Sequence, residues 1–417
     1  MSIVLSGKLN SFQKSMKEEC ENNESAGILE REDGRVVIPA DSMPSLKGKY
    51  FGNERGELTT IEVLYLLERR GYKLLDSGEE MSFEELLLRY VKEDPRILVK
   101  YIAYRDWRDR GVFPFEMDSI PKHFSPGEHE PKFYPTEETH FPGIPESKCH
   151  FFPEMEMSIV FDRKVAETLY YQSWFGQLGK YKQEKAGENL SLDLIETLYL
   201  VGKEDFDLEV REAGTDRDLS CDDLMDFAIQ RHPEIQDLLS VYSDWRDSGY
   251  IVKTGFKFGA HFRIYFPGAG TGRNRWVHSK HVLHVFPKSY QMLMSEWGRI
   301  IRLSQSVRKT FILGIPSLSE GDYDQEVKAD LLLYHRTKDG VEEPTSHTPT
   351  FLCVAIPETL RMSGLKLANA LREAESMGLQ LLIAVVDRET DINYYVARKI
   401  NLEGSHNNYY EIYWYRP

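Results

Sequence analysis

The chain has 417 residues, 41% of them hydrophobic, so it is long enough for about two or three domains and apolar enough for packed cores. Its four cysteines are scattered and form no CxxC pair, which argues against a zinc site or a disulfide framework. The longest apolar run, residues 379–386, is far too short to cross a bilayer, and the N-terminus lacks a signal-peptide cleavage pattern. We therefore expect a cytoplasmic protein with no membrane partner.

Charge is distributed unevenly along the chain. The net charge of −15 argues at first against nucleic acid as a partner. Residues 242–315, however, hold 12 Lys and Arg against 3 Asp and Glu, whereas the rest of the chain holds 40 against 64. A basic segment inside an acidic protein is the pattern expected of a local polyanion site. Chance unevenness along the chain is the alternative interpretation.

Three helices are predicted near the N-terminus, in residues 58–70, 82–90 and 96–110. The first carries apolar residues at helical spacing, the second opens with the capping box Ser-Phe-Glu-Glu, and the third ends at Gly111. Residues 114–153 follow and contain 8 of the 19 prolines. Such a composition is typical of an extended connector or an eroded domain.

The same helical unit recurs later in the chain. LTTIEVLYL, MSFEEL and YRDWRDRG, which begin at residues 58, 81 and 104, return as LDLIETLYL, LSCDDL and YSDWRDSG at offsets of 134, 138 and 138 residues. A nearly constant offset indicates two copies of one unit. The second copy has an insertion that carries Lys180, Lys182 and Lys185. These lysines could reach a phosphate backbone, or they could belong to an ordinary solvated loop.

Strands are predicted after the second copy. Residues 249–266 alternate between apolar and more polar side chains and are rich in β-branched and aromatic residues. A weaker relation links HVLHVFP at 281–287 to FLCVAIP at 351–357, and FILGI at 311–315 to LLIAVVD at 381–387. We interpret residues 320–417 as a second copy of the strand-rich half.

Three residues of the basic segment have side chains suited to RNA cleavage without a metal. Attack by the 2′-OH needs a base for its proton, an acid for the departing 5′ oxygen, and a cation for the transition-state charge. Tyr265, His278 and Lys309 could supply these groups. Taken singly, each is more often a core tyrosine, a surface histidine or a surface lysine, so residue types alone do not identify a site.

The sequence resembles a known family in this region. YSDWRDSGYIVKTGFKFGAHFRIY, then HSKHVLHVFP and IRLSQSVRKTFILGI, resemble the catalytic C-terminal half of archaeal tRNA-splicing endonucleases. The helical half before them resembles that family's N-terminal domain, so the resemblance covers residues 160–417, with 28–112 as a second N-terminal-type copy. It implies that Tyr265, His278 and Lys309 act as base, acid and charge stabiliser. It also implies that Arg302 stacks on a bulge nucleotide of the RNA.

The resemblance implies a reaction and a homodimer. The enzyme is expected to cut precursor tRNA at both ends of an intron in a bulge–helix–bulge fold, leaving 2′,3′-cyclic phosphate and 5′-OH ends, with no metal and no cofactor. The C-terminal copy has Tyr334, His347 or Thr348, and Leu379 at the corresponding positions, so it should be inert. Two cuts then require two chains. An acidic docking loop is expected at Asp387, Glu389 and Asp391, although DRETD could also be an ordinary hairpin turn.

We therefore predict an α+β protein of duplicated endonuclease units. The expected order is an N-terminal-type helical unit at 1–112, a Pro-rich connector or eroded domain at 113–157, the N-terminal half of the catalytic unit at 158–241, its catalytic half at 242–315, and a non-catalytic structural unit at 316–417. Two alternatives stay open. One is a non-catalytic RNA-binding or assembly subunit of the same fold, and the other is a magnesium-dependent nuclease, for which the basic segment offers few acids.

Overall fold

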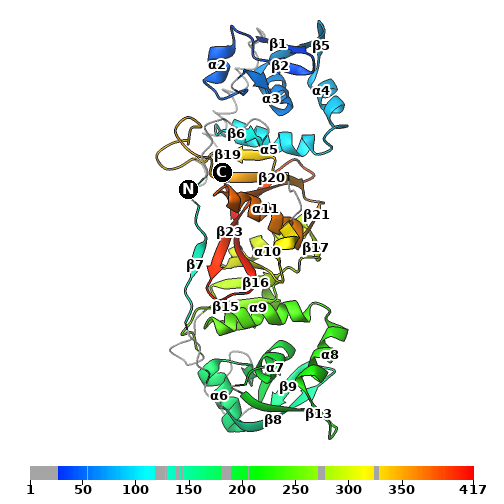
Figure 1. Cartoon of the computed structure of the whole chain (residues 1–417), viewed down its shortest axis with the longest axis vertical. Helices are drawn as coiled ribbons and strands as arrows, with labels where there is room; N and C mark the ends of the chain where they lie inside the picture. The colour runs from blue at the N-terminus through cyan, green and yellow to red at the C-terminus, as the bar shows by residue number, and fades with distance from the viewer. Residues whose placement is uncertain are drawn as a thin grey trace, which may run out of the picture.

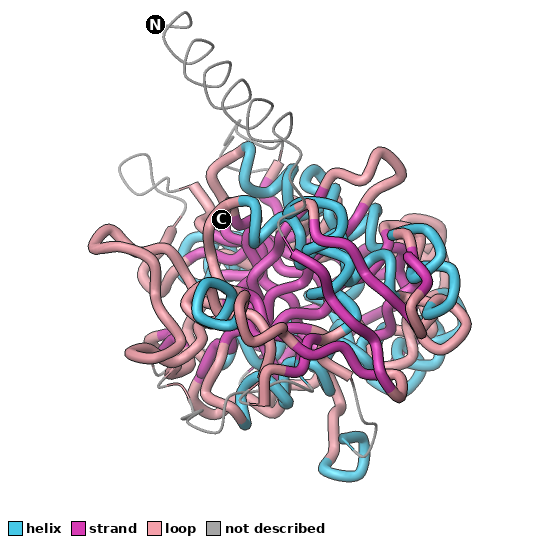
Figure 2. Tube along the Cα trace, turned by 90° about the horizontal axis from the view of Figure 1, so that it is seen from above, coloured by secondary structure: helices cyan, strands magenta, loops and turns pink. Residues whose placement is uncertain are grey.

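The computed structural model describes residues 27–53, 55–117, 127, 129–137, 141, 144–179, 189–204, 206–270, 278–323 and 328–417. This part of the chain is elongated, with a large central sheet between two helical units (Figure 1). Viewed along the long axis, strands lie in the middle with helices around them (Figure 2). Helices and mixed sheets thus confirm the α+β prediction. None of the helices in the described ranges has the length and apolar character needed to span a membrane.

The first helical unit packs helices on a five-stranded sheet of order β3-β2-β1-β4-β5. Its strands are β1 (Gly27–Glu32), β2 (Arg35–Val37), β3 (Glu57–Leu58), β4 (Tyr72–Asp76) and β5 (Glu79–Met81), and its helices are α2 (Met43–Lys47), α3 (Thr60–Arg70), α4 (Phe83–Tyr90) and α5 (Ile97–Asp109). The three predicted helices are confirmed as α3, α4 and α5. Thr59 and Ser82 cap α3 and α4 in capping boxes with Glu62 and Glu85, which satisfy backbone N–H groups at the helix starts.

The second helical unit has the same plan around a six-stranded sheet of order β10-β11-β9-β8-β12-β13. Its strands are β8 (Ile144–Phe152), β9 (Met157–Val160), β10 (Gln177–Leu178), β11 (Leu190–Asp193), β12 (Phe206–Glu212) and β13 (Asp218–Leu219), and its helices are α6 (Arg163–Ser173), α7 (Leu194–Val201), α8 (Cys221–Arg231) and α9 (Ile235–Asp247). Asp193 and Ser220 cap α7 and α8, again in capping boxes.

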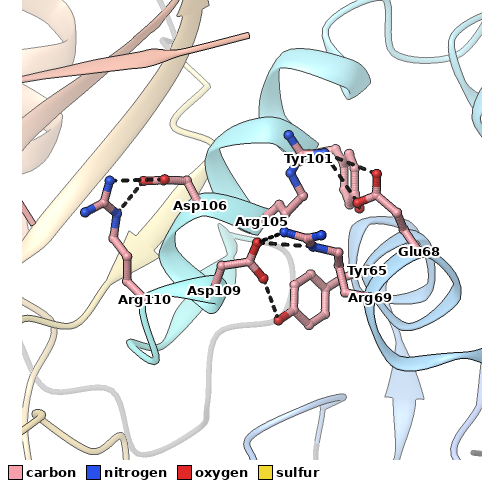
Figure 3. A network of polar contacts seen from close by, with 8 residues as sticks. All are labelled: Tyr65, Glu68, Arg69, Tyr101, Arg105, Asp106, Asp109 and Arg110. Atoms are coloured by element: carbon pink, nitrogen blue, oxygen red, sulfur yellow. Dashed lines mark hydrogen bonds and ion pairs between the residues drawn. The ribbon is translucent and has the colours of Figure 1, made fainter. Parts of the chain in front are cut away.

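A matching contact joins two helices within each helical unit. In the first unit the Tyr65 hydroxyl donates to Asp109 at 3.1 Å, which joins α3 to α5 within a wider network of arginines and carboxylates (Figure 3). In the second unit Tyr199 donates to Asp247 at 2.6 Å and joins α7 to α9. The Trp-Arg-Asp segments that recur in the sequence therefore make the same contact in both places.

The arginine of each Trp-Arg-Asp segment also has the same role. Arg108 lies 3.8 Å from the Phe51 ring centroid, and Arg246 lies 4.0 Å from the Phe175 ring centroid. Both guanidinium groups are buried, and both donate to backbone carbonyls of the segment just before the phenylalanine. A buried guanidinium needs such acceptors, because unpaired burial of a charge is costly.

The central sheet has eleven strands and contains the candidate site. Its order is β14-β15-β16-β18-β24-β23-β22-β20-β19-β6, with β7 paired to β23. The strands are β6 (Pro114–Glu116), β7 (Lys132–Tyr134), β14 (Ile251–Thr254), β15 (Phe262–Tyr265), β16 (His281–Val285), β18 (Thr310–Ile315), β19 (Leu331–Leu333), β20 (Phe351–Pro357), β22 (Gln380–Val386), β23 (Ile392–Leu402) and β24 (Asn408–Tyr415). Along β18, Phe311 and Leu313 pack on one side of the sheet, whereas Ile312 packs on the other. Helices α10 (Met294–Ser306) and α11 (Gly364–Ser376) cover the first side, and α9 and α5 cover the second.

The two halves of the central sheet are built alike. Strands β16 and β18 are parallel and joined through α10, and β20 and β22 are parallel and joined through α11. Two short strands, β17 (Gln291–Leu293) and β21 (Arg361–Ser363), pair with each other ahead of these helices. The last two strands are divided between the two halves of the sheet, since β24 pairs with β18 and β23 pairs with β22. The weak relation between residues 281–315 and 351–387 thus corresponds to two similar strand–helix–strand units.

The Pro-rich stretch 113–157, expected as a connector or an eroded domain, is divided among three places in the fold. Strand β6 forms one edge of the central sheet, β7 pairs with β23, and β8 belongs to the sheet of the second helical unit. Pro114 is compatible with β6 because an edge strand leaves one row of N–H positions without a partner. Composition alone does not reveal these long-range pairings.

Candidate active site

Three strand ends bring Tyr265, His278 and Lys309 to the same end of the central sheet. Strand β15 runs antiparallel to β16 with Ile264 opposite His281, and β16 runs parallel to β18 with His281 opposite Thr310. Tyr265 is the last residue of β15, His278 lies just before β16, and Lys309 lies just before β18. Residues up to 44 positions apart in sequence therefore lie at the same end of neighbouring strands, as expected for a site assembled from strand ends.

Lys309 is tied to the segment that carries His278. Its Nζ donates to the Ser279 hydroxyl at 2.6 Å and to the Ser279 carbonyl, and Ser279 directly follows His278. Burial lowers the pKa of Lys309, and the nearby cations Arg263 and Lys280 lower it further. The mutual repulsion of these groups is relieved when a polyanion binds among them.

Tyr265 is buried against the second helical unit. Its ring centroid lies 4.9 Å from that of Trp174, with the ring planes at 50°, and the Arg263 guanidinium lies 5.9 Å from the same tyrosine ring. Trp174 ends α6 in a left-handed conformation with φ of 48°, which is uncommon for a non-glycine residue. The helical unit thus supplies part of the wall around Tyr265.

Sequence reasoning did not identify Trp174, although a signal was present. Phe51 and Phe175 are corresponding positions, since each packs on the arginine of its Trp-Arg-Asp segment, and the residues before them are Tyr50 and Trp174. Tyr50 also has a positive φ, 58°, and packs on Phe113 at 4.6 Å. An aromatic residue before the phenylalanine in both copies therefore points to a shared wall between helical unit and sheet.

His278 is exposed, so its imidazole is accessible to a substrate. The histidines that follow it are buried and have different surroundings. His281 packs between Tyr134 and Phe266, at 5.4 and 5.2 Å between ring centroids. The ring centroid of His284 lies 4.3 Å from that of His261. Within the described ranges, no group of three or more His, Cys, Asp or Glu side chains is arranged to hold a metal ion.

Arg302 lies on α10 and contacts β23 rather than the strand that carries Tyr265. Its Nη1 donates to the Tyr395 hydroxyl at 2.7 Å, and Tyr395 belongs to β23. Strand β23 is four strand spacings from β15, roughly 19 Å at about 4.8 Å per spacing. Gly298 permits this approach of helix to strand, because a Cβ there would lie 2.5 Å from the Tyr395 hydroxyl. The structure therefore places the Arg302 guanidinium over the junction of the two sheet halves.

The corresponding positions in the other half of the sheet carry different chemistry. Leu379 precedes β22 as Lys309 precedes β18, and it is buried in the core under α11. Tyr334 is buried beside Phe115, and burial raises its pKa to about 12. His347 is exposed and contacts its neighbour Ser346.

The acidic segment with Asp387, Glu389 and Asp391 forms the tight turn between β22 and β23. The Asp387 carboxylate accepts from the backbone N–H groups of Glu389 and Asp391 at 2.8 and 2.9 Å. Asp387 is therefore used within the turn, whereas the side chains of Glu389 and Asp391 are exposed. Lys180, Lys182 and Lys185 lie outside the described residues, and the strands on either side of them, β10 and β11, pair with each other.

A buried ion pair that sequence reasoning did not identify joins the catalytic sheet to the second helical unit. Lys253 on β14 donates to Glu196 on α7 at 2.8 Å and to the Gly176 carbonyl at 2.8 Å. Burial lowers the pKa of Lys253, and burial, followed by the charge of Glu196, raises the pKa of Asp193 to about 7. Phe115 occupies the position 138 residues earlier, so this ion pair is specific to the second copy.

Comparison with known proteins shows that two segments of the chain match the two domains of one enzyme family. Residues 156–225 match the N-terminal domain of tRNA intron endonucleases, and residues 235–328 match the catalytic C-terminal domain of tRNA intron endonucleases. The tRNA-splicing endonuclease of Methanococcoides burtonii is 25% identical over 332 residues, which are 66% of this chain and 91% of the relative. Those of Hyperthermus butylicus and Thermococcus gammatolerans are both 34% identical, over 161 and 156 residues. These shorter stretches are 38% and 37% of this chain, and 84% and 82% of the relatives.

Proposed function

The chain belongs to the tRNA intron endonuclease family, and we propose that it cuts precursor tRNA at intron boundaries within a bulge–helix–bulge fold. The observation that carries this proposal is the meeting of Tyr265, His278 and Lys309 at one sheet end, inside the segment that matches the catalytic domain. The cations around Lys309 make that end suitable for a phosphate backbone.

The proposed reaction is transesterification by the 2′-OH. Tyr265 removes the 2′-OH proton, and the oxygen forms a bond to the adjacent phosphorus. The bond from phosphorus to the 5′ oxygen breaks, and His278 gives that oxygen a proton. Lys309 offsets the additional negative charge on the phosphoryl oxygens, while Arg263 lies beside the Tyr265 ring and stabilises the phenolate form that takes the proton and becomes neutral. The products carry a 2′,3′-cyclic phosphate and a 5′-OH, and no metal ion takes part.

Two cuts are proposed to come from a homodimer. Each chain has one set of the three residues, since Leu379 replaces the lysine in the other half of the sheet. The exposed carboxylates of Glu389 and Asp391, presented by a turn that Asp387 closes, suit docking into a basic surface of the second chain.

Additional RNA contacts are assigned to residues outside the cutting site. Lys180, Lys182 and Lys185 bind backbone phosphates, and Arg302 stacks on a bulge nucleotide. The bond from Arg302 to Tyr395 would hold the guanidinium in place for that contact without neutralising its charge. Replacing the three lysines by serine should weaken RNA binding and flatten its dependence on salt.

The test uses bulge–helix–bulge RNA in excess EDTA with wild-type protein and the His278→Ala and Lys309→Ala variants. We expect wild-type cleavage with cyclic-phosphate ends, and losses of about 10²–10⁴ in rate for His278→Ala. Binding without cleavage by the wild type would favour a non-catalytic RNA-binding subunit. Cleavage restored only by magnesium would favour a metal-dependent nuclease.

A further inference from the structure

The turn between β14 and β15 presents an aromatic ring to solvent. Phe256 is 87% exposed and is the most exposed of the large apolar side chains in the ranges that the structure describes. It belongs to a short 3-10 helix, η2 (Phe256–Phe258), inside the basic segment of the chain. An exposed phenylalanine contributes little to the core, and within a basic segment its flat face is accessible to a ligand.

Hydrogen bonds within the turn fix the backbone that carries this ring. The Phe258 N–H donates to the Gly255 carbonyl at 2.8 Å, the Gly259 N–H donates to the Phe256 carbonyl at 3.1 Å, and the Gly255 N–H donates to the His261 carbonyl at 2.7 Å. Gly259 adopts a φ of 66°, which favours glycine. Because the backbone is already ordered, stacking on the ring restricts only the side-chain rotation of Phe256.

The same turn is anchored beside Lys309. Phe258 packs against the core under α10, and the Lys309 Nζ lies 5.1 Å from the Phe258 ring centroid. Arg263 reaches the other side of the turn, where its Nε donates to the Thr254 carbonyl at 2.7 Å. Phe256 is therefore two residues from the ring that contacts the proposed charge-stabilising lysine and two residues from the carbonyl that Arg263 contacts.

We infer that Phe256 is a stacking platform for an unpaired nucleobase next to the phosphate that is cut. Cations bind the sugar–phosphate backbone, and an exposed ring accepts the face of a base that is not paired. A phenyl ring has no hydrogen-bonding group, so it distinguishes unpaired from paired bases and not one base from another. This inference rests on the proposed function, because bulged nucleotides at the cut are what supply such bases.

The test measures stacking separately from cleavage. A bulge–helix–bulge RNA carries 2-aminopurine in place of each bulge nucleotide in turn, and fluorescence is followed on binding to protein in a His278→Ala background, where the RNA stays intact. We expect quenching at one bulge position, and its loss in Phe256→Ala, with binding weaker by about 5- to 150-fold. Phe256→Trp should retain both the quenching and the affinity.

The matched control is Phe133→Ala, which removes another exposed phenylalanine, from β7. This control should bind like the parent protein. If wild-type protein cuts the RNA but Phe256→Ala leaves quenching and affinity unchanged, the stacking inference is wrong while the proposed function stands. If wild-type protein neither binds nor cuts the RNA, both are wrong.

Discussion

At the scale of single residues, the site depends on side chains that come from different units of the chain. Tyr265 ends one strand of the central sheet and Lys309 directly precedes another, but the ring beside Tyr265 is Trp174 from the second helical unit. A tyrosine that takes a proton must be held within a narrow range of positions. We therefore propose that the indole positions Tyr265.

Replacing Trp174 should reduce cleavage without removing any reacting group. We expect Trp174→Ala to lower the single-turnover rate by about 10- to 100-fold, because a displacement of about 1 Å can cost 10²-fold. The lost packing should also lower the free energy of unfolding by about 3–5 kcal/mol. Trp174→Phe should recover part of the rate.

The control for this prediction is Tyr50→Ala, which removes the corresponding aromatic residue beside the other half of the sheet. It should lower stability and leave the rate unchanged once the protein is folded. Equal rates for Trp174→Ala and Tyr50→Ala would show that the indole only packs and does not position the base.

At the scale of elements, β16 carries two buried histidines directly behind the site. Burial lowers the pKa of His281 to about 4 and of His284 to about 3. For His281, the charge of Glu411 opposes this effect, whereas Lys132, Lys280 and Lys309 add to it; for His284, His261 adds to it. Both imidazoles are therefore neutral in the folded protein near neutral pH.

Acid should weaken the fold through these histidines. An unfolded histidine has a pKa of about 6.5, so the unfolded chain binds more protons than the folded chain between pH 6.5 and 4, and stability falls as pH drops through that range. For His281 the difference in pKa between the unfolded and the folded protein corresponds to roughly 3 kcal/mol in the free energy of unfolding. In chemical unfolding at each pH, His281→Leu should lose less stability than wild type, and His347→Leu, at an exposed position, should follow wild type. A His281→Leu curve parallel to that of wild type would contradict this account.

Much of the element structure could be predicted from sequence, because it follows from local chemistry. Capping boxes and apolar spacing located α3 and α4 to within about two residues, and the alternating pattern located β14 and β15. The pairing of β6, β7 and β8 could not be predicted, since it depends on partners that lie far away in the chain. The same holds for Lys253, whose partner Glu196 becomes its neighbour only after the sheet has packed on α7.

The candidate site could likewise be predicted only in part from the sequence. Chemistry made Tyr265, His278 and Lys309 plausible, the resemblance selected them, and the strand register explains why they lie at one end of the sheet. The surroundings of these residues could not be predicted. Trp174 beside Tyr265 and Phe258 under Lys309 both come from contacts between elements that no local pattern encodes.

At the scale of the whole molecule, one half of the central sheet is built from both ends of the chain. Strand β6 and helix α5 pack with β19, β20 and β22, and buried Asp330 pairs with Arg96 at 2.9 Å and with Lys100 at 3.2 Å. The catalytic unit lies between these segments in sequence and at the other end of the molecule in space (Figure 1). One chain therefore joins the half of the sheet that carries Tyr265 and Lys309 to a second, similarly built half through a continuous sheet.

The proposed homodimer makes a prediction at this scale. Wild-type protein should have twice the 48.5 kDa mass of one chain in light scattering. Replacing Asp387, Glu389 and Asp391 by lysine should shift the mass toward one chain, because the docking charges are reversed. The same change at Glu30, Glu32 and Asp33, around the acidic β1–β2 turn, is the control and should leave the mass unchanged. A wild type with the mass of a single chain would rule out this assembly.

The central claim is that a single site per chain cuts RNA by 2′-OH attack without a metal. The most direct measurement uses a bulge–helix–bulge RNA in which the nucleotide before one cut carries a 2′-deoxy sugar, incubated with wild-type protein in excess EDTA. We predict that this cut is abolished, while the other cut proceeds and leaves a 2′,3′-cyclic phosphate. Cleavage at the 2′-deoxy position, or 5′-phosphate ends at the other, would contradict the account.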